Sequence, residues 1–140
     1  MDWIMAGTVV SGGLLLGGMV FFSAVVAPLV FVKLPEQEAA RFIRALFPFY
    51  YLYGALTAAA CAVLMFAVNI TLAVVVALVA GLFVYARQVL MPQINAARDA
   101  EQGGDAAAGR RFRYLHRWSV TLNAVQLLGV LAALARVAGS

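Results

Sequence analysis

Long apolar stretches alternate with shorter polar ones along the whole of this 140-residue chain. Each apolar stretch holds roughly the 20 residues that a helix needs to cross the hydrocarbon core of a bilayer. The four stretches cover about residues 4–32, 48–68, 70–90 and 115–137. The third is rich in valine, but an isolated strand leaves its backbone groups unpaired in lipid, so a helix is expected there too. The pattern therefore predicts an all-α integral membrane four-helix bundle, formed as one domain over residues 1–140.

Two longer polar intervals, residues 33–47 and 91–114, connect the first span to the second and the third to the fourth. In the first interval, Pro35 suits a helix start and apolar residues follow it at helical spacing. We expect a short amphipathic helix between spans 1 and 2 that lies at the membrane surface, with a solvated connector as the alternative. In the second interval, the third helix is expected to continue to about Ala100, and residues 103–109 are expected to form a loose, disordered connection.

Polar side chains enter the last span at intervals of three, four and three residues, which places them on one face of a helix. An amide without a partner in hydrocarbon costs on the order of a few kcal/mol. We therefore expect this face to point into the bundle. Its members are His116, Ser119, Asn123 and Gln126.

A second polar stripe begins at the start of the second span, where Tyr50, Tyr53 and Thr57 share a helical face. Polar side chains in a membrane bundle are stabilised by hydrogen bonds to neighbouring helices. The two stripes are therefore expected to meet and to line the interior.

The approaches to the second and fourth spans resemble each other, because RFIRALFPFYYLYG and RFRYLHRWSVTLN both lead from an Arg-Phe pair into a helix. The match needs a gap. It indicates a parallel repeat, in which an axis along the membrane normal relates the two hairpins.

The first span is rich in small residues, and Gly13 and Gly17 form a GxxxG pair in it. Such spacing lets another helix approach closely. Packing within the chain is the simpler explanation, and contact with a second copy or another membrane protein is the alternative. Pro28 is expected to bend the same helix.

Composition agrees with a membrane protein, because 65% of the residues are hydrophobic and only 11% are charged. The net charge is +4, but the basic residues adjoin apolar stretches instead of covering a soluble face, so no nucleic acid partner is expected. All ten lysines and arginines except Arg136 flank the first and third connections. The positive-inside rule then places both termini outside the cytoplasm of a multi-pass inner-membrane protein.

The basic residues at the start of the last span form the densest cluster in the chain. Each can contribute about 1 kcal/mol to the binding of anionic lipid headgroups on the cytoplasmic side. Orientation by charge alone is the alternative. The cluster consists of Arg110, Arg111, Arg113 and Arg117.

Classical hydrolysis is not expected, because the chain has one histidine and one cysteine and carries no phosphate-binding loop or metalloprotease motif. No enzymatic activity is predicted. His116 is a candidate axial ligand for haem, since a neutral imidazole suits that role. A hydrogen bond from His116 to a phosphate, a carbonyl or a neighbouring helix is the alternative.

Sulfur ligands offer a second candidate site. Cys61 and Met65 lie one helical turn apart, and Met5 is expected at a similar depth. Thiolate and thioether groups favour Cu(I). Core packing is the alternative, because methionine and cysteine are common core residues.

The chain resembles a known family over nearly its whole length. The resemblance lies in FFSAVVAPLVFVKLP, RFIRALFPFYYLYG, the pair Pro92 and Asn95, and RFRYLHRWSVTLNAVQLL. Its most specific parts are Phe47, Pro48 and Tyr50, and the later set Leu115, His116, Ser119 and Asn123. On these residues the chain is similar to the DUF4149 or TMEM205-like membrane proteins.

This resemblance implies a small four-helix integral membrane protein whose activity is poorly defined. Animal members are associated with tolerance to platinum drugs, which hints at handling of soft metals. The layout is more distantly similar to the copper resistance D family and to a small haem-containing protoporphyrinogen oxidase family, but no residue motif carries either activity over.

The sequence thus predicts a non-enzymatic inner-membrane protein. It is expected to act as an accessory or assembly subunit, or to handle small solutes or soft metals, and no resident cofactor is expected. Four helices make a small transporter, so a transport path would need a homo-oligomer or a partner. The alternative is a haem-binding membrane redox protein that uses His116.

Overall fold

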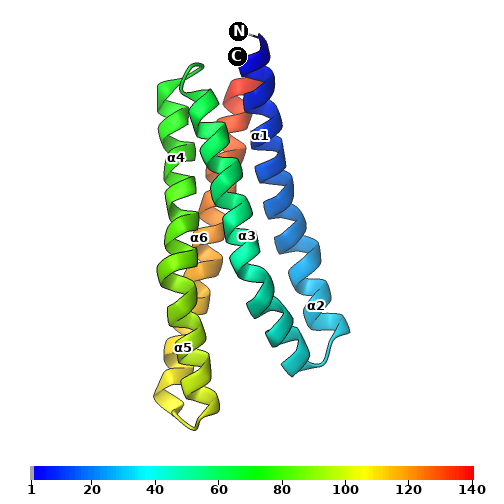
Figure 1. The fold of residues 1–140 in the computed structure, drawn as a ribbon, viewed down its shortest axis with the longest axis vertical. Helices are drawn as coiled ribbons and strands as arrows, with labels where there is room; N and C mark the ends of the chain where they lie inside the picture. The colour runs from blue at the N-terminus through cyan, green and yellow to red at the C-terminus, as the bar shows by residue number, and fades with distance from the viewer. Residues whose placement is uncertain (1) are drawn as a thin grey trace.

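The computed structural model describes residues 2–140, and every regular element in that range is helical. The elements join into four long helical segments, seen in Figure 1. In chain order they are α1 (Asp2–Phe21), η1 (Phe22–Val26) and α2 (Ala27–Lys33); α3 (Glu36–Met65); α4 (Ile70–Tyr85), η2 (Ala86–Leu90) and α5 (Met91–Gln102); and α6 (Ala106–Ala138). The predicted all-helical bundle is confirmed.

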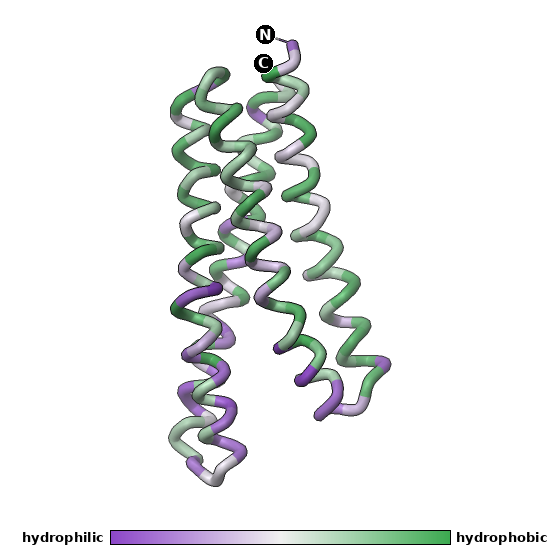
Figure 2. Tube along the Cα trace, viewed as in Figure 1, coloured by the Kyte–Doolittle hydropathy of each residue, from purple (hydrophilic) through white to green (hydrophobic). Residues whose placement is uncertain are grey.

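The four segments run up and down as an antiparallel bundle, with both termini at one end (Figure 1). Helix α1 packs beside α3 and α6, and α4 packs beside the same two helices. All four segments, of 30 to 33 residues, are long and apolar enough to cross a membrane. At 1.5 Å per residue they measure roughly 45–50 Å, so they extend beyond a hydrocarbon core of about 30 Å. Figure 2 shows hydrophilic residues gathered at the end opposite the termini.

The short amphipathic helix expected between the first two spans is not a separate element. Residues 36–47 form the first turns of α3, which continues through Pro48 to Met65. Ala39 and Ile43 are buried, so the apolar face of this segment packs against the protein and not on the membrane surface. The separate helix was wrong because no turn residue interrupts the chain after Pro35.

The connection between α5 and α6 is also tighter than the sequence suggested. Gly103 and Gly104 make the turn, and Gly104 has a φ of 104°, which favours glycine. Asp105 caps α6, because its Oδ1 accepts from the backbone N–H groups of Ala107 and Ala108 at 3.0 and 3.2 Å. The last glycine of the expected loose segment, Gly109, lies inside α6. The two helices therefore form an ordered hairpin at the polar end of the molecule.

Two π-helical turns interrupt the first and third segments. η1 starts at Phe22 and η2 at Ala86, and in both cases a proline, Pro28 or Pro92, stands six positions after the first residue of the turn. A proline ring clashes with the carbonyl four residues before it in an α-helix. The wider π turn, closed here by bonds to residues five positions back, relieves that clash. Both helices therefore pass their proline without ending.

The core lies between the four segments in the half of the bundle that holds the termini. Its largest fully buried side chains come from α1, α3, α4, η2 and α6. They include Leu15, Met19, Met65, Phe83, Leu90 and Val130. Close packing of α3 on α4 depends on Gly54, where a Cβ would lie 2.6 Å from the Phe83 ring.

Candidate intramembrane polar site

Three polar side chains from three different segments meet inside the bundle. The Tyr50 hydroxyl of α3 donates to Asn123 Oδ1 of α6 at 2.6 Å, and Asn123 Nδ2 donates to Ser23 Oγ of η1 at 3.0 Å. Tyr50 is buried, Asn123 is half-buried and Ser23 is exposed on the outside of the bundle. The structure thus joins the two polar stripes at Tyr50 and Asn123, and the resulting polar group reaches the outer surface through Ser23.

Aromatic rings enclose the Tyr50 side of this group. The Phe22 ring stacks on Tyr50 with 4.0 Å between centroids, and Phe47 and Phe83 meet Tyr50 edge-on at 6.3 and 6.0 Å. Offset and edge-on rings attract each other and exclude water. The hydroxyl of Tyr50 is therefore held at the boundary between an aromatic cluster and the Asn123 amide.

Gln126, Tyr53 and Thr57, three further members of the two stripes, are paired with backbone carbonyls. Gln126 is buried and donates to the Val79 carbonyl at 3.1 Å, which ties α6 to α4. Tyr53 was expected to line the interior, but it is exposed on the outside of α3, where it donates to the Leu14 carbonyl at 2.6 Å and so ties α3 to α1. Thr57 bonds to the carbonyl of Tyr53 within its own helix at 2.7 Å. Gln126 and Tyr53 thus hold helices together, and none of the three groups adds a donor to the polar site.

His116 and Ser119 do not reach the polar site. His116 is exposed, and its ring stacks on Phe112 at 5.9 Å between centroids. The Ser119 hydroxyl donates to the His116 carbonyl at 2.8 Å. His116 was expected to line the interior, but this part of α6 lies toward the polar end, where the bundle gives it less cover.

The three candidate sulfur ligands all contribute to the hydrophobic core. Cys61 donates to the Thr8 carbonyl at 3.6 Å, Met65 is fully buried, and Met5 packs against the same hydrophobic cluster. Within residues 2–140, no three His, Cys, Asp or Glu side chains come together as a metal site. The placement of the sulfur atoms is compatible with packing and leaves Cu(I) binding as a prediction.

Charged residues gather at the polar end. Arg44 of α3 makes a two-pronged ion pair with Asp99 of α5 at 2.7 and 2.9 Å. Asp99 lies beyond the apolar stretch of its helix, and the hydrogen bond from Arg44 lowers the pKa of its carboxyl below the ordinary value. Arg98 lies 5.0 Å from the centre of the Phe112 ring. The predicted headgroup residues Arg110, Arg111, Arg113 and Arg117 are all exposed on α6.

The glycines of α1 divide into two groups. Gly7, Gly12 and Gly18 face neighbours, since an added Cβ would lie 2.9 Å or less from Leu64, Leu134 or Tyr53. The GxxxG pair, Gly13 and Gly17, is exposed and has no atom within 4 Å of an added Cβ. Packing within the chain therefore explains the first group and does not explain the GxxxG pair.

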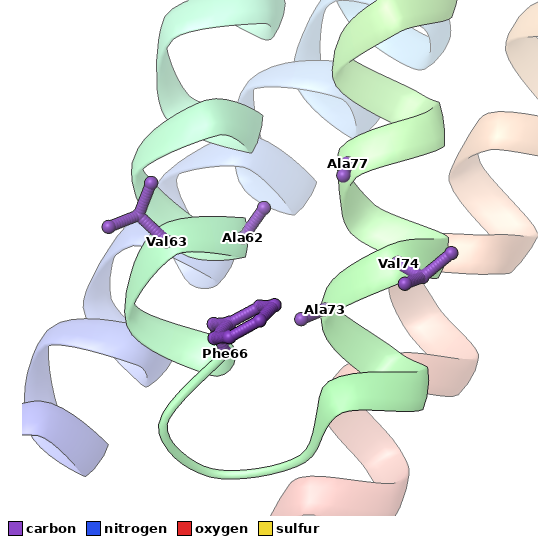
Figure 3. Close-up of a pocket in the computed structure, with 6 residues that line it drawn as sticks. All are labelled: Ala62, Val63, Phe66, Ala73, Val74 and Ala77. Atoms are coloured by element: carbon purple, nitrogen blue, oxygen red, sulfur yellow. The ribbon is translucent and has the colours of Figure 1, made fainter.

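A hollow lies elsewhere, on the outside of α3 and α4 near the turn that joins them (Figure 3). It is open, encloses about 370 Å³ and is lined only by apolar side chains. They are Ala62, Val63, Phe66, Ala73, Val74 and Ala77. The hollow offers no polar group to orient a ligand.

Two contacts were missed by sequence reasoning. Ser23 stands in the apolar run FFSAVV, and Arg87, which the sequence places among the basic residues flanking the third connection, donates through Nε to the Pro48 carbonyl at 3.2 Å. Both residues occupy the second position of a π turn. The sequence signal that could have found them is the distance to the next proline, because Ser23 and Arg87 both stand five positions before it, at Pro28 and Pro92.

Four antiparallel helices of membrane-spanning length and composition, with polar groups paired between them, define a multi-pass integral membrane protein. The chain matches the family described as Domain of unknown function (DUF4149) over residues 10–103, which is more than half of its length. It belongs to that family. No curated protein and no solved structure matches the chain.

Proposed function

We propose that this DUF4149 protein is a non-enzymatic accessory or assembly subunit that acts by helix contact within the membrane. The partner would be a second copy of the chain or another membrane protein, and it would bind at the outer face of α1. The observation that carries this proposal is how little of α1 the rest of the chain covers. Only 11% of the most apolar part of the first segment, Asp2–Lys33, is buried, against 28% to 33% for the other three segments.

Two further features support an association through this face. Gly13 and Gly17 leave the α1 backbone open, and close approach of backbones is what drives packing of helices in lipid. The inward polar groups Tyr50, Asn123 and Gln126 are already bonded to each other or to a carbonyl, so the interior offers few free donors for a reaction. The proposal therefore follows from two features: the polar groups of the interior are already paired, and the outer face of α1 is not covered by the rest of the chain.

The test compares Gly13→Leu/Gly17→Leu with Gly81→Leu. Gly81 of α4 is also exposed and has no atom within 4 Å of an added Cβ, so it is a matched control on another helix. Subunit counting by photobleaching in liposomes should show oligomers for the wild type and the control, and a shift to monomers for the double variant. Equal counts for all three proteins would remove α1 as the contact face.

The membrane and the orientation belong to the same proposal. We place the protein in the inner membrane with both termini outside the cytoplasm, because the basic residues gather at the end opposite the termini. Anionic headgroups of the cytoplasmic leaflet would then meet the exposed Arg110, Arg113 and Arg117.

A second candidate function is the handling of soft metal ions. It is favoured by one observation, that Met5, Cys61 and Met65 contribute to one core cluster. Cys61→Ala with Met65→Leu should then abolish Cu(I) binding by the purified protein and lower metal tolerance of the cell. Unchanged binding would leave these residues as core packing alone.

A further inference from the structure

Arg87 is a charged residue inside the third apolar stretch, and it points toward α3 instead of toward lipid. Its neighbours one turn away on the same face, Phe83 and Leu90, are both 0% exposed. The guanidinium Nε donates to the Pro48 carbonyl at 3.2 Å, and Nη1 donates to Gln88 Oε1 at 3.1 Å. The side chain is therefore fixed between two helices and does not extend freely toward water.

The charge of Arg87 has no protein counter-charge among the described residues. The ion pairs in residues 2–140 join Arg44 to Asp99 and Arg98 to Glu36, and Arg87 takes part in neither. A guanidinium has five N–H groups, and two of those of Arg87 have protein acceptors. A half-buried arginine without a counter-charge is unfavourable unless an anion accepts hydrogen bonds from its remaining N–H groups.

Gln88 supplies a second donor at the same place. Its Oε1 accepts from Arg87, so its amide N–H₂ is turned away from the guanidinium and, in an exposed residue, is available to a ligand. An oxyanion with several acceptor oxygens can then bond to Arg87 and Gln88 together.

The depth of Arg87 in the membrane also favours the binding of an oxyanion. Pro48 begins the second apolar stretch, and Arg87 lies close to the end of the third, so their contact falls at the boundary of the hydrocarbon core. Lipid phosphates lie at this boundary. The contact is built on η2, and single π turns inside α-helices occur frequently at functional sites.

From these contacts we infer that Arg87 and Gln88 on η2 bind a phosphate-type anion against α3. The anion is the phosphate of an anionic phospholipid or a free phosphate. This site is separate from the exposed arginines of α6 and from the outer face of α1, so it does not rest on the proposed function.

Native mass spectrometry of protein extracted in mild detergent tests the lipid source, with phosphatidylglycerol and phosphatidylcholine as probes. We expect the wild type to retain phosphatidylglycerol. Arg87→Gln should reduce retention about tenfold, as expected for the loss of charge-assisted hydrogen bonds. Arg136→Gln removes one exposed charge at the other end and should leave retention unchanged.

Inorganic phosphate, added to delipidated protein in a thermal unfolding assay, tests the free anion. A stabilisation that disappears in Arg87→Gln, without selective lipid retention, would support the site with a soluble ligand. If Arg87→Gln fails to fold by circular dichroism, Gln88→Leu decides, and it should weaken the same binding several-fold. The inference is overturned if neither probe binds the wild type, or if binding survives both substitutions or depends only on Arg110 and Arg117.

Discussion

Tyr50 and Asn123 show how single side chains hold together helices that are distant in the sequence. Their stripes could be predicted, because residues three and four apart share a helical face and an unpaired amide is unfavourable in lipid. Ser23 could not be predicted as their third partner. Its direction depends on the π turn at η1, and that turn depends on Pro28 further along the chain.

Replacing Tyr50 by phenylalanine tests the hydrogen bond to Asn123. The ring stays, but Asn123 Oδ1 loses its donor at 2.6 Å. Hydrogen bonds between membrane helices typically contribute about 1 kcal/mol, so the free energy of unfolding should fall by about that amount. Unfolding by SDS in bicelles measures the change. Tyr114→Phe, at an exposed position on α6, is the control and should have no effect.

Gly54 and Gly81 give a second prediction, about packing. A methyl group at Gly54 would lie 2.6 Å from the buried Phe83 ring, whereas one at Gly81 has no atom within 4 Å. Gly54→Ala should therefore destabilise the protein by about 1–3 kcal/mol through overpacking, and Gly81→Ala should leave its stability nearly unchanged. Thermal unfolding in detergent distinguishes them. A similar effect of both would indicate that α3 and α4 do not pack as described.

At the scale of elements, the four helices and their approximate spans followed from the apolar pattern, and so did the extension of the third helix to about Ala100; that helix ends at Gln102. The start of the second helix did not follow, because the segment after Pro35 continues into the second span with nothing to end the helix there. Helix ends depend on capping and on packing partners such as buried Ala39, which the linear sequence does not reveal. His116 was placed in the interior from its helical face alone, but it is exposed because the bundle gives less cover to the part of α6 that lies toward the polar end.

Arg44 and Asp99 tie α3 to α5, and reversing their charges tests that link. Arg44→Asp and Asp99→Arg should each lower stability, and the double variant should recover most of the loss. The effect should be small because both side chains are about half exposed, at 46% and 54%. Thermal unfolding at low salt measures it, and 1 M NaCl should remove most of it.

The same link has a definite pH dependence. Arg44 lowers the pKa of the Asp99 carboxyl in the folded protein, so the stabilisation is present above the ordinary pKa of an aspartate, about 3.9. It is lost as the pH falls through the lowered value of the folded state. The double-mutant coupling should thus be constant from pH 5 to 8 and disappear in stronger acid. Coupling that increases in acid would contradict this assignment.

At the scale of the whole molecule, both termini lie at the apolar end of the bundle, and the α5–α6 hairpin extends past the other end (Figures 1 and 2). The fold alone does not state which end faces the cytoplasm. The distribution of arginines supplies that inference, because they gather around the hairpin and the start of α3.

Cysteine labelling of intact cells tests this orientation. In a Cys61→Ala background, a membrane-impermeant maleimide should label Ser140→Cys from outside, and Gln102→Cys only after lysis. Both positions are exposed at opposite ends of the bundle. Labelling of Gln102→Cys in intact cells would reverse the proposed topology.

The matching interruptions at η1 and η2 also bear on how such a chain could arise. Each lies in the first helix of a hairpin whose second helix is α3 or α6, and each has a proline six positions after its first residue. Tandem duplication of a gene for a single hairpin would produce this pattern. Because the second helix of the first hairpin ends where the first helix of the next begins, joining the copies required only the short turn before Asn69. On this view, the ancestral protein was a pair of identical hairpins inserted in the same direction, and fusion allowed Ser23 and Arg87 to diverge.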